Sequence, residues 1–233
     1  MTNIRIDYYK KLYENNEVTM EPSNFAKDIV PYLSKEHTLY DLGGGNLRDA
    51  LYLSAFVKKV IVVDPAAPPV PEGYPNVSIR NVPVHDYLSD FSSTEPCVIY
   101  CRFLLHLLTK EERLSLYSLL RNFAPADSLL FFEYRLHHNE DFYKKQKDMN
   151  RPKRQSVTYK DPFYLSEKSF SVVLYSEVNY FSTTETEDPL LQRVFAIRKC
   201  LKSLCRKGAG PGDWVKNMRN KGAKKKYRIM NAI

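Results

Sequence analysis

Residues Thr38-Leu-Tyr-Asp-Leu-Gly-Gly-Gly-Asn-Leu-Arg-Asp49 place three consecutive glycines directly after a short apolar run. The apolar run is typical of a strand, and residues 46–57 carry apolar side chains at helical spacing. Glycine has no Cβ and tolerates positive φ, so the three glycines can turn sharply and leave room for a ligand. The stretch predicts a strand, a tight turn and a helix, with either a bound nucleoside or no ligand at the turn.

A second strand and a carboxylate complete this unit. Val60-Ile-Val-Val-Asp64 is an apolar run that ends in an acid. This layout is typical of the ribose-binding half of a doubly wound sheet, in which the acid accepts hydrogen bonds from the ribose hydroxyls. A dinucleotide fingerprint requires glycine where this chain has Arg48, and Asp41 suits a ligand's ammonium group better than a phosphate. The unit therefore indicates a nucleoside ligand that is not a dinucleotide.

The remaining apolar runs predict further strands at 77–81, 97–102, 128–134, 170–180 and 190–199. A capping box at Thr109-Lys-Glu-Glu112 predicts a helix that runs to about Phe123. We expect an α/β fold, doubly wound and mostly parallel, with five parallel strands, a terminal antiparallel pair and helices on both faces. Ligands of such sheets bind outside the carboxyl ends of the strands.

Four polar residues lie at or just past the ends of the fourth and fifth predicted strands. Arg102 lies beside apolar neighbours, and a buried cation needs a partner or a function. His106 is either a packed histidine or a general base. Glu133 and Arg135 share one strand face and form either a structural ion pair or contacts to an acceptor.

Several segments together resemble the class I S-adenosylmethionine-dependent methyltransferases, and more loosely a bacterial branch often found with surface-polysaccharide genes. They are Glu21-Pro-Ser-Asn-Phe-Ala26, Asp41-Leu-Gly-Gly-Gly-Asn-Leu-Arg-Asp49, Cys101-Arg-Phe-Leu-Leu-His106, Phe132-Glu-Tyr-Arg135 and Glu187-Asp-Pro-Leu-Leu-Gln-Arg-Val-Phe-Ala-Ile-Arg198. The resemblance covers residues 8–199, and it departs from the usual pattern at Gly44 and over 144–161. It implies a seven-stranded Rossmann-like sheet and S-adenosylmethionine as the cofactor.

The resemblance also implies which residues form the site. Asp86 would face the adenine amino group, unless it only caps a surface helix. The implied cofactor-binding residues are Tyr9, Asp41, Leu42, Gly43, Gly44, Gly45, Asn46, Arg48, Asp64, Pro65, His85, Asp86, Cys101 and Arg102. The candidate catalytic residues, on the acceptor side, are His106, Arg102, Glu133 and Arg135.

Composition narrows the class of protein. The 233 residues contain no long apolar run, and the first residues lack a hydrophobic signal segment, so we expect a cytoplasmic protein without a transmembrane segment. The four cysteines form no Cys-x-x-Cys pair, and the five histidines are not at metal-ligand spacing. No disulfide and no metal site is predicted.

The positive charge lies almost entirely in the last residues. Residues 200–233 carry ten Lys or Arg and one acid, a net of +9, which leaves −1 for residues 1–199 out of the total of +8. We expect a methyltransferase domain at 1–199, whose segment 1–36 is a helical lid, and a basic, glycine-containing tail at 200–233. The tail is compatible with binding to RNA or with binding to the anionic inner face of a membrane. It is also compatible with a solvated terminus that binds nothing.

The resemblance favours O-methylation of a sugar or another polar group of a surface glycan or its precursor. The residues after the fourth strand, Tyr100-Cys-Arg-Phe103, lack the Pro-Pro motif of base-amino methyltransferases. One alternative is an RNA (cap) methyltransferase that uses the tail to bind RNA. Another is a non-catalytic interaction module with a methyltransferase-like fold.

Overall fold

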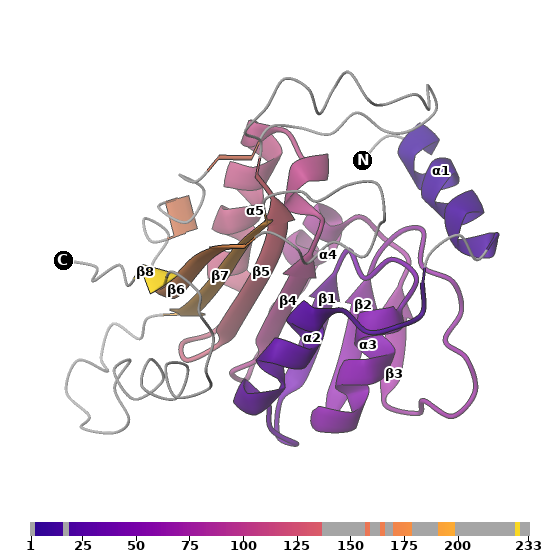
Figure 1. Ribbon diagram of the computed structural model, residues 1–233, viewed down its shortest axis with the longest axis horizontal. Helices are drawn as coiled ribbons and strands as arrows, with labels where there is room; N and C mark the ends of the chain where they lie inside the picture. The colour runs from indigo at the N-terminus through magenta and orange to yellow at the C-terminus, as the bar shows by residue number, and fades with distance from the viewer. Residues whose placement is uncertain are drawn as a thin grey trace.

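The apolar runs form one sheet in the structure, a computed structural model that describes residues 3–15, 19–136, 157–158, 164–165, 170–178, 191–198 and 227–228. Five strands lie parallel: β1 (Thr38–Leu42), β2 (Lys59–Val63), β3 (Val77–Arg80), β4 (Val98–Arg102) and β5 (Leu129–Arg135). β7 (Leu191–Arg198) is antiparallel to β5, and β6 (Phe170–Val178) is antiparallel to β7. The predicted fold class is confirmed (Figure 1).

The sheet differs from the prediction in its number of strands. In the described part of the chain it has eight, in the order β3-β2-β1-β4-β5-β7-β6-β8. The additional strand is β8 (Tyr227–Arg228), which pairs with Tyr175 and Ser176 of β6. An edge strand leaves backbone hydrogen-bonding groups unpaired, so two residues of the predicted tail extend the sheet there. The rest of the tail lies outside the described residues.

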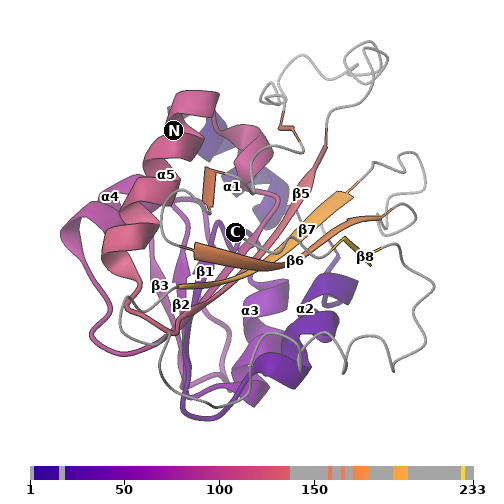
Figure 2. The ribbon, with the colours of Figure 1, turned by 90° about the vertical axis from the view of Figure 1, so that its left-hand side faces the viewer.

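Helices cover both faces of the sheet (Figure 2). α4 (Val84–Asp90) and α5 (Lys110–Phe123) pack on one face, and α2 (Asn24–Ile29) and α3 (Arg48–Leu53) on the other. Side chains alternate along each strand, so Leu39 of β1 belongs to the core under α2 and α3, and Tyr40 to the core under α4 and α5. Short 3-10 helices at Val30–Tyr32, Ser54–Phe56 and Leu105–Leu107 follow α2, α3 and β4.

The predicted helix start at Thr109 is confirmed. The Thr109 side chain accepts a hydrogen bond from the Glu112 backbone, and the Glu112 side chain accepts one from the Thr109 backbone. This reciprocal pair satisfies backbone donors that the first turn of a helix leaves without partners. The predicted helix after the glycines begins later than expected, at Arg48, because Leu47 takes a left-handed conformation.

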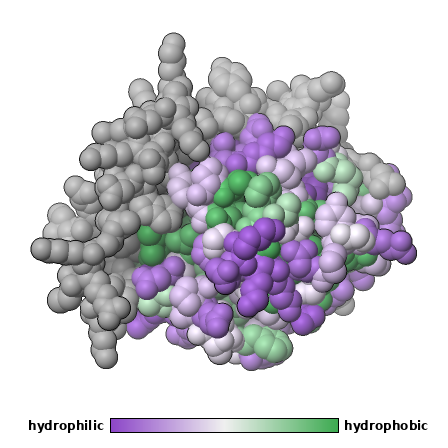
Figure 3. All heavy atoms as spheres, turned by 90° about the horizontal axis from the view of Figure 1, so that it is seen from below, coloured by the Kyte–Doolittle hydropathy of each residue, from purple (hydrophilic) through white to green (hydrophobic). Residues whose placement is uncertain are grey.

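The order of the strands defines where a ligand would bind. The chain passes from β1 outward to β2 and β3, then returns to place β4 on the other side of β1. A ligand of such a sheet binds at this reversal, outside the carboxyl ends of β1 and β4. α1 (Asn3–Glu14) lies at this end of the sheet (Figure 1). Figure 3 shows the opposite end, where hydrophilic side chains cover much of the described surface.

Candidate functional site

The glycine turn, Gly43–Gly45, connects β1 to α3. Gly43 and Gly45 have φ values of +77° and +56°, which side chains with a Cβ rarely adopt. Gly44 is required for a different reason, because a Cβ there would lie 2.6 Å from Val62 Cγ1 and 2.8 Å from Asp41 Oδ2. The turn therefore lies directly on the Asp41 carboxylate, and alanine fits at none of its positions without a shift.

Asp41 is a buried carboxylate with an incomplete set of partners. It is 2% exposed, and its Oδ2 atom has no hydrogen-bond partner among the described residues. Burial raises the pKa of Asp41 well above its usual range, and the negative charges of Asp49 and Asp64 raise it further. An orphaned buried oxygen beside a turn in which a Cβ would clash fits a cationic group of a ligand, such as an ammonium.

Asp64 connects β2 to the glycine turn. Its Oδ2 atom accepts a hydrogen bond from the Gly45 backbone at 3.0 Å, and its Oδ1 atom accepts one from the Ala66 backbone at 2.7 Å. Burial raises the pKa of Asp64, and these two hydrogen bonds oppose the shift. The acid therefore lies next to the turn, as the spacing of the sequence predicts, and also helps to hold its shape.

α1 covers the turn through Tyr13. The Tyr13 hydroxyl oxygen lies 2.9 Å from the position that a Cβ would take at Gly45, and the ring stacks on Tyr9 with centroids 6.0 Å apart. Burial raises the pKa of Tyr13, and the negative charge of Asp64 adds to the shift. α2 behaves differently, because its residues Phe25, Ala26 and Ile29 are fully buried in the core. Within the predicted lid segment, α1 is thus the helix that covers the turn.

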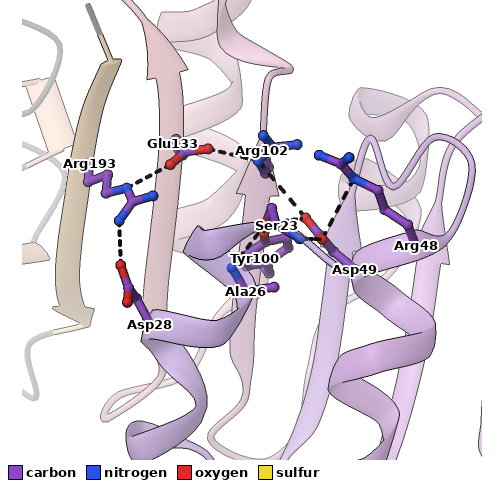
Figure 4. A network of polar contacts seen from close by, with 9 residues as sticks. All are labelled: Ser23, Ala26, Asp28, Arg48, Asp49, Tyr100, Arg102, Glu133 and Arg193. Atoms are coloured by element: carbon purple, nitrogen blue, oxygen red, sulfur yellow. Dashed lines mark hydrogen bonds and ion pairs between the residues drawn. The ribbon is translucent and has the colours of Figure 1, made fainter. Parts of the chain in front are cut away.

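A chain of alternating charges includes two of the acceptor-side candidates, Arg102 and Glu133. We call it the charge chain, and it consists of Asp28, Arg193, Glu133, Arg102 and Asp49 (Figure 4). Glu133 accepts hydrogen bonds from Arg102 Nε at 2.7 Å and from Arg193 Nε at 2.6 Å, one on each carboxylate oxygen. Arg193 also donates to Asp28. Burial lowers the pKa of Arg102, but the interactions with Glu133, Tyr100 and Asp49 together outweigh it and raise the net value.

Phe103 lies between the acceptor-side candidates. Its φ is +60°, an unusual conformation for a bulky residue, and its backbone N–H donates to the Glu133 carbonyl at 2.8 Å. The guanidinium carbons of Arg102 and Arg135 lie 4.0 Å and 5.3 Å from the centre of its ring. His106, which is 6% exposed, contacts the ring edge-on at 5.6 Å. Arg102, His106 and Arg135 thus converge on one aromatic ring at the ends of β4 and β5.

The other predicted cofactor-binding residues lie in varied settings. Asn46 donates to the Thr19 carbonyl at 3.1 Å, which draws the segment before α2 over the turn. Asp86 is exposed in the first turn of α4, and a His85 ring nitrogen lies 2.8 Å from the Glu112 carbonyl of α5. The remaining four are Leu42 and Cys101, which are buried, and Arg48 and Pro65, which are partly buried. Burial, together with Asp41, raises the pKa of the Cys101 thiol.

Several residues near the predicted site were not predicted from the sequence. Arg193 joins it from β7, and Asp49 accepts hydrogen bonds from Ser23 and Tyr100. The only local signal for Arg193 and Asp49 is a charge within an otherwise apolar pattern. Partners 60 residues away in the sequence, as for Arg193 and Glu133, cannot be assigned from such a pattern.

Comparisons with solved structures agree with this geometry. A methyltransferase from Anabaena variabilis, described as SAM-dependent, matches with a TM-score of 0.64 at 16% identity over 85% of this chain and 96% of that one. DhpI in complex with SAH matches with a TM-score of 0.57 at 14% identity over 84% and 96%. A SAM-dependent methyltransferase from Methanosarcina mazei matches with 0.56 at 15% identity over 74% and 97%. The chain therefore has the fold of the class I methyltransferases.

No protein-family model and no curated protein sequence matches the chain. Among the described residues, no group of three or more His, Cys, Asp or Glu side chains is arranged to hold a metal ion. The described helices include none with the length and apolar character needed to cross a membrane.

Proposed function

We propose that the protein is an S-adenosylmethionine-dependent methyltransferase. The observation that carries this proposal is the donor side, where the orphaned Asp41 oxygen, the glycine turn and Asp64 meet at the strand-order reversal. Asp41 would hold the ammonium group, Asp64 the ribose hydroxyls and Asp86 the adenine amino group. We propose that the other predicted cofactor-binding residues line this site. When bound, S-adenosylmethionine supplies a methyl group activated by its sulfonium.

The acceptor side is proposed to be the surface around Phe103. His106 is the candidate base, because it lies at this edge and imidazole accepts a proton near neutral pH. Arg102 and Arg135 would favour an anionic or hydroxyl-rich acceptor. Both oxygens of Glu133 already accept hydrogen bonds from arginines, so its proposed role is to hold Arg102 in place. Alignment of donor and acceptor supplies much of the acceleration in such a displacement.

Calorimetry with adenosylhomocysteine tests the donor assignment. Asp64→Asn should weaken binding by about tenfold or more, since charge-assisted hydrogen bonds contribute roughly 1.5–3 kcal/mol. Asp90→Asn is the matched control, because Asp90 is exposed at the end of α4. Tight binding of a nicotinamide dinucleotide in place of adenosylhomocysteine would end the proposal.

For the acceptor, we propose a sugar hydroxyl or similar polar group of a surface glycan or its precursor. The support is the resemblance to the polysaccharide-associated branch together with the arginines around Phe103. A methyl-donor assay across glycan, RNA and small-molecule acceptors tests it, with His106→Ala beside the unaltered protein. Full activity of His106→Ala would remove His106 from the mechanism.

The second candidate is RNA methylation, which the net charge of +9 in residues 200–233 favours. The same charge supports adsorption to an anionic membrane surface. Replacing the lysines at 224–226 by glutamine leaves Tyr227–Arg228 in place to pair with β6. Loss of binding to RNA, but not to anionic vesicles, would favour the RNA candidate. The third candidate is an interaction module without catalytic activity. Methyl transfer to any acceptor would exclude it.

A further inference from the structure

Two guanidinium groups face each other above Asp49 (Figure 4). Arg48 is the first residue of α3, and Arg102 is the last residue of β4. Arg48 Nε lies 3.8 Å from Asp49 Oδ1, and Arg102 Nε lies 4.0 Å from Asp49 Oδ2. The pair therefore spans the reversal of strand order, with the glycine turn on one side and Phe103 on the other.

The negative charge of Asp49 compensates the charges of Arg48 and Arg102, but Asp49 accepts no hydrogen bond from either arginine. Its oxygens accept from the Ser23 backbone at 2.7 Å, from the Ser23 hydroxyl at 2.8 Å and from the Tyr100 hydroxyl at 2.8 Å. Separations of 3.8 Å and 4.0 Å are too long for a hydrogen bond. The guanidinium donors that face the site are therefore not satisfied by the carboxylate beneath them.

Among the described residues, Arg48 has an ion-pair partner, Asp49, but no hydrogen-bond acceptor. Its side chain is 11% exposed, yet it makes no hydrogen bond to the part of the chain that the structure describes. Arg102 differs, because its Nε atom donates to Glu133. Burial lowers the pKa of Arg48, and the positive charge of Arg102 lowers it further. The Arg48 N–H groups are therefore available to an acceptor, and the neighbouring positive charge of Arg102 favours an anionic one.

We propose that Arg48 and Arg102 together bind an anionic group with at least two oxygens, a carboxylate or a phosphate. Guanidinium groups present planar forks of N–H donors that match such oxygens, and two of them can hold one anion from both sides. Asp49 and Glu133 hold the two arginines in place before the anion arrives. This inference rests on the proposed function for the source of the anion, which is the donor's amino-acid carboxylate or an acidic group of the acceptor.

The test uses the full chain carrying Arg48→Gln. Affinity is measured by calorimetry for adenosylhomocysteine, which has a carboxylate, and for 5′-methylthioadenosine, which lacks the amino-acid part. A thermal-shift series with inorganic phosphate measures anion binding directly. Arg121→Gln is the matched control, because Arg121 is an exposed arginine on α5. Arg102 is left intact, because its removal would also break the charge chain.

Arg48→Gln should bind adenosylhomocysteine about tenfold or more weakly and 5′-methylthioadenosine unchanged, if the anion is the donor's carboxylate. The variant could instead bind adenosylhomocysteine as tightly as the unaltered protein but no longer be stabilised against heat by phosphate. That result would support the site and assign the anion to the acceptor. In both cases the unliganded variant should melt no lower than the unaltered protein, because the substitution relieves repulsion between the arginines. A structural arginine would instead lower the melting temperature.

Two results would overturn the inference: equal loss of affinity for both nucleosides, and no change in nucleoside affinity or phosphate protection. If the unaltered protein binds neither nucleoside, the proposed function fails on its own. The phosphate series then still decides about the arginine pair, because it does not depend on the donor.

Discussion

The glycine turn, which follows β1, and the charge chain, which runs from α2 through β7, β5 and β4 to α3, differ in how their polar groups are satisfied. On the turn side, Asp41 Oδ2 is buried without a hydrogen-bond partner among the described residues. In the charge chain, both oxygens of Glu133 accept hydrogen bonds from guanidinium groups. Buried polar groups are nearly always paired within a protein. This difference is why we propose a ligand at the orphaned group and a scaffold role for the paired ones.

The largest expected effect is on the charge chain. Glu133→Leu leaves Arg102 and Arg193 buried without their shared carboxylate, so we expect a loss of about 3–5 kcal/mol of unfolding free energy. Urea denaturation followed by circular dichroism measures it. Glu111→Leu, on the exposed side of α5, is the control and should stay within about 0.5 kcal/mol. A loss below 1 kcal/mol for Glu133→Leu would show that water replaces the carboxylate.

On the turn side, Gly44→Ala should destabilise by about 1–3 kcal/mol and abolish most nucleoside binding. The added Cβ would contact Val62 and Asp41 beneath the turn, so the turn must move away from the site. Gly73→Ala separates backbone strain from crowding, because Gly73 has φ +92° and nothing within 4 Å of its Cβ position. That control should cost about 1 kcal/mol and leave binding intact. Equal affinities for the two variants would contradict the prediction.

Asp41→Asn tests whether the orphaned carboxylate is poised for a cation. The folded-state pKa is raised, so stability from Asp41 is present below the unfolded pKa and lost as pH rises through the folded value. The variant should therefore gain about 1 kcal/mol over the unaltered protein as pH rises above about 4.

Binding supplies the complementary measurement for Asp41. An ammonium group favours the ionised carboxylate and opposes the raised pKa of Asp41, so adenosylhomocysteine binding should release a proton from Asp41 at a pH between the pKa values of the free and the bound protein. Calorimetry in buffers of different ionisation enthalpy detects the proton, and Asp41→Asn should eliminate its release. Identical proton release by the two proteins would assign it to another group.

The smallest expected effect is on α1. Tyr13→Ala removes the ring that rests on Gly45, so amide exchange in Asn3–Glu14 should become faster while global stability falls by about 0.5–1 kcal/mol. Hydrogen exchange measured by mass spectrometry resolves the helix from the sheet. Tyr13→Phe keeps the ring and should keep the protection of α1 against amide exchange. Faster exchange in Tyr13→Phe as well would show that the hydroxyl, and not the ring, makes the stabilising contact.

Local signals accounted for most of the fold. The capping box at Thr109, the apolar runs and the glycine cluster each predicted an element that the structure contains. The arrangement of the glycine turn and its acids was also predictable, because Asp41 directly precedes the turn and Asp64 follows the next strand. The structure corrected details that depend on tertiary context, such as the start of α3 after Leu47 and the eighth strand at the edge of β6.

The partners of the charged residues were not predictable in the same way. Glu133 and Arg135 share a strand face, which suggested a pair, yet the ion pairs described for Glu133 are with Arg102 and Arg193. A two-residue period gives direction along one strand, but the neighbour of a side chain depends on which strand lies beside it. Tyr13 shows the same limit, because nothing in its local pattern specifies contact with Gly45.

The sequence by itself determined the elements, the doubly wound sheet and the glycine turn with its flanking acids, because these depend on short-range periodicity and backbone conformation. Only the tertiary structure decided that β7 supplies Arg193, that Glu133 is fully paired and that Arg48 meets Arg102 above Asp49. The physical reason is that burial and charge pairing depend on groups that approach from distant parts of the chain. Whether a charged side chain serves as scaffold or awaits a ligand depends on those neighbours.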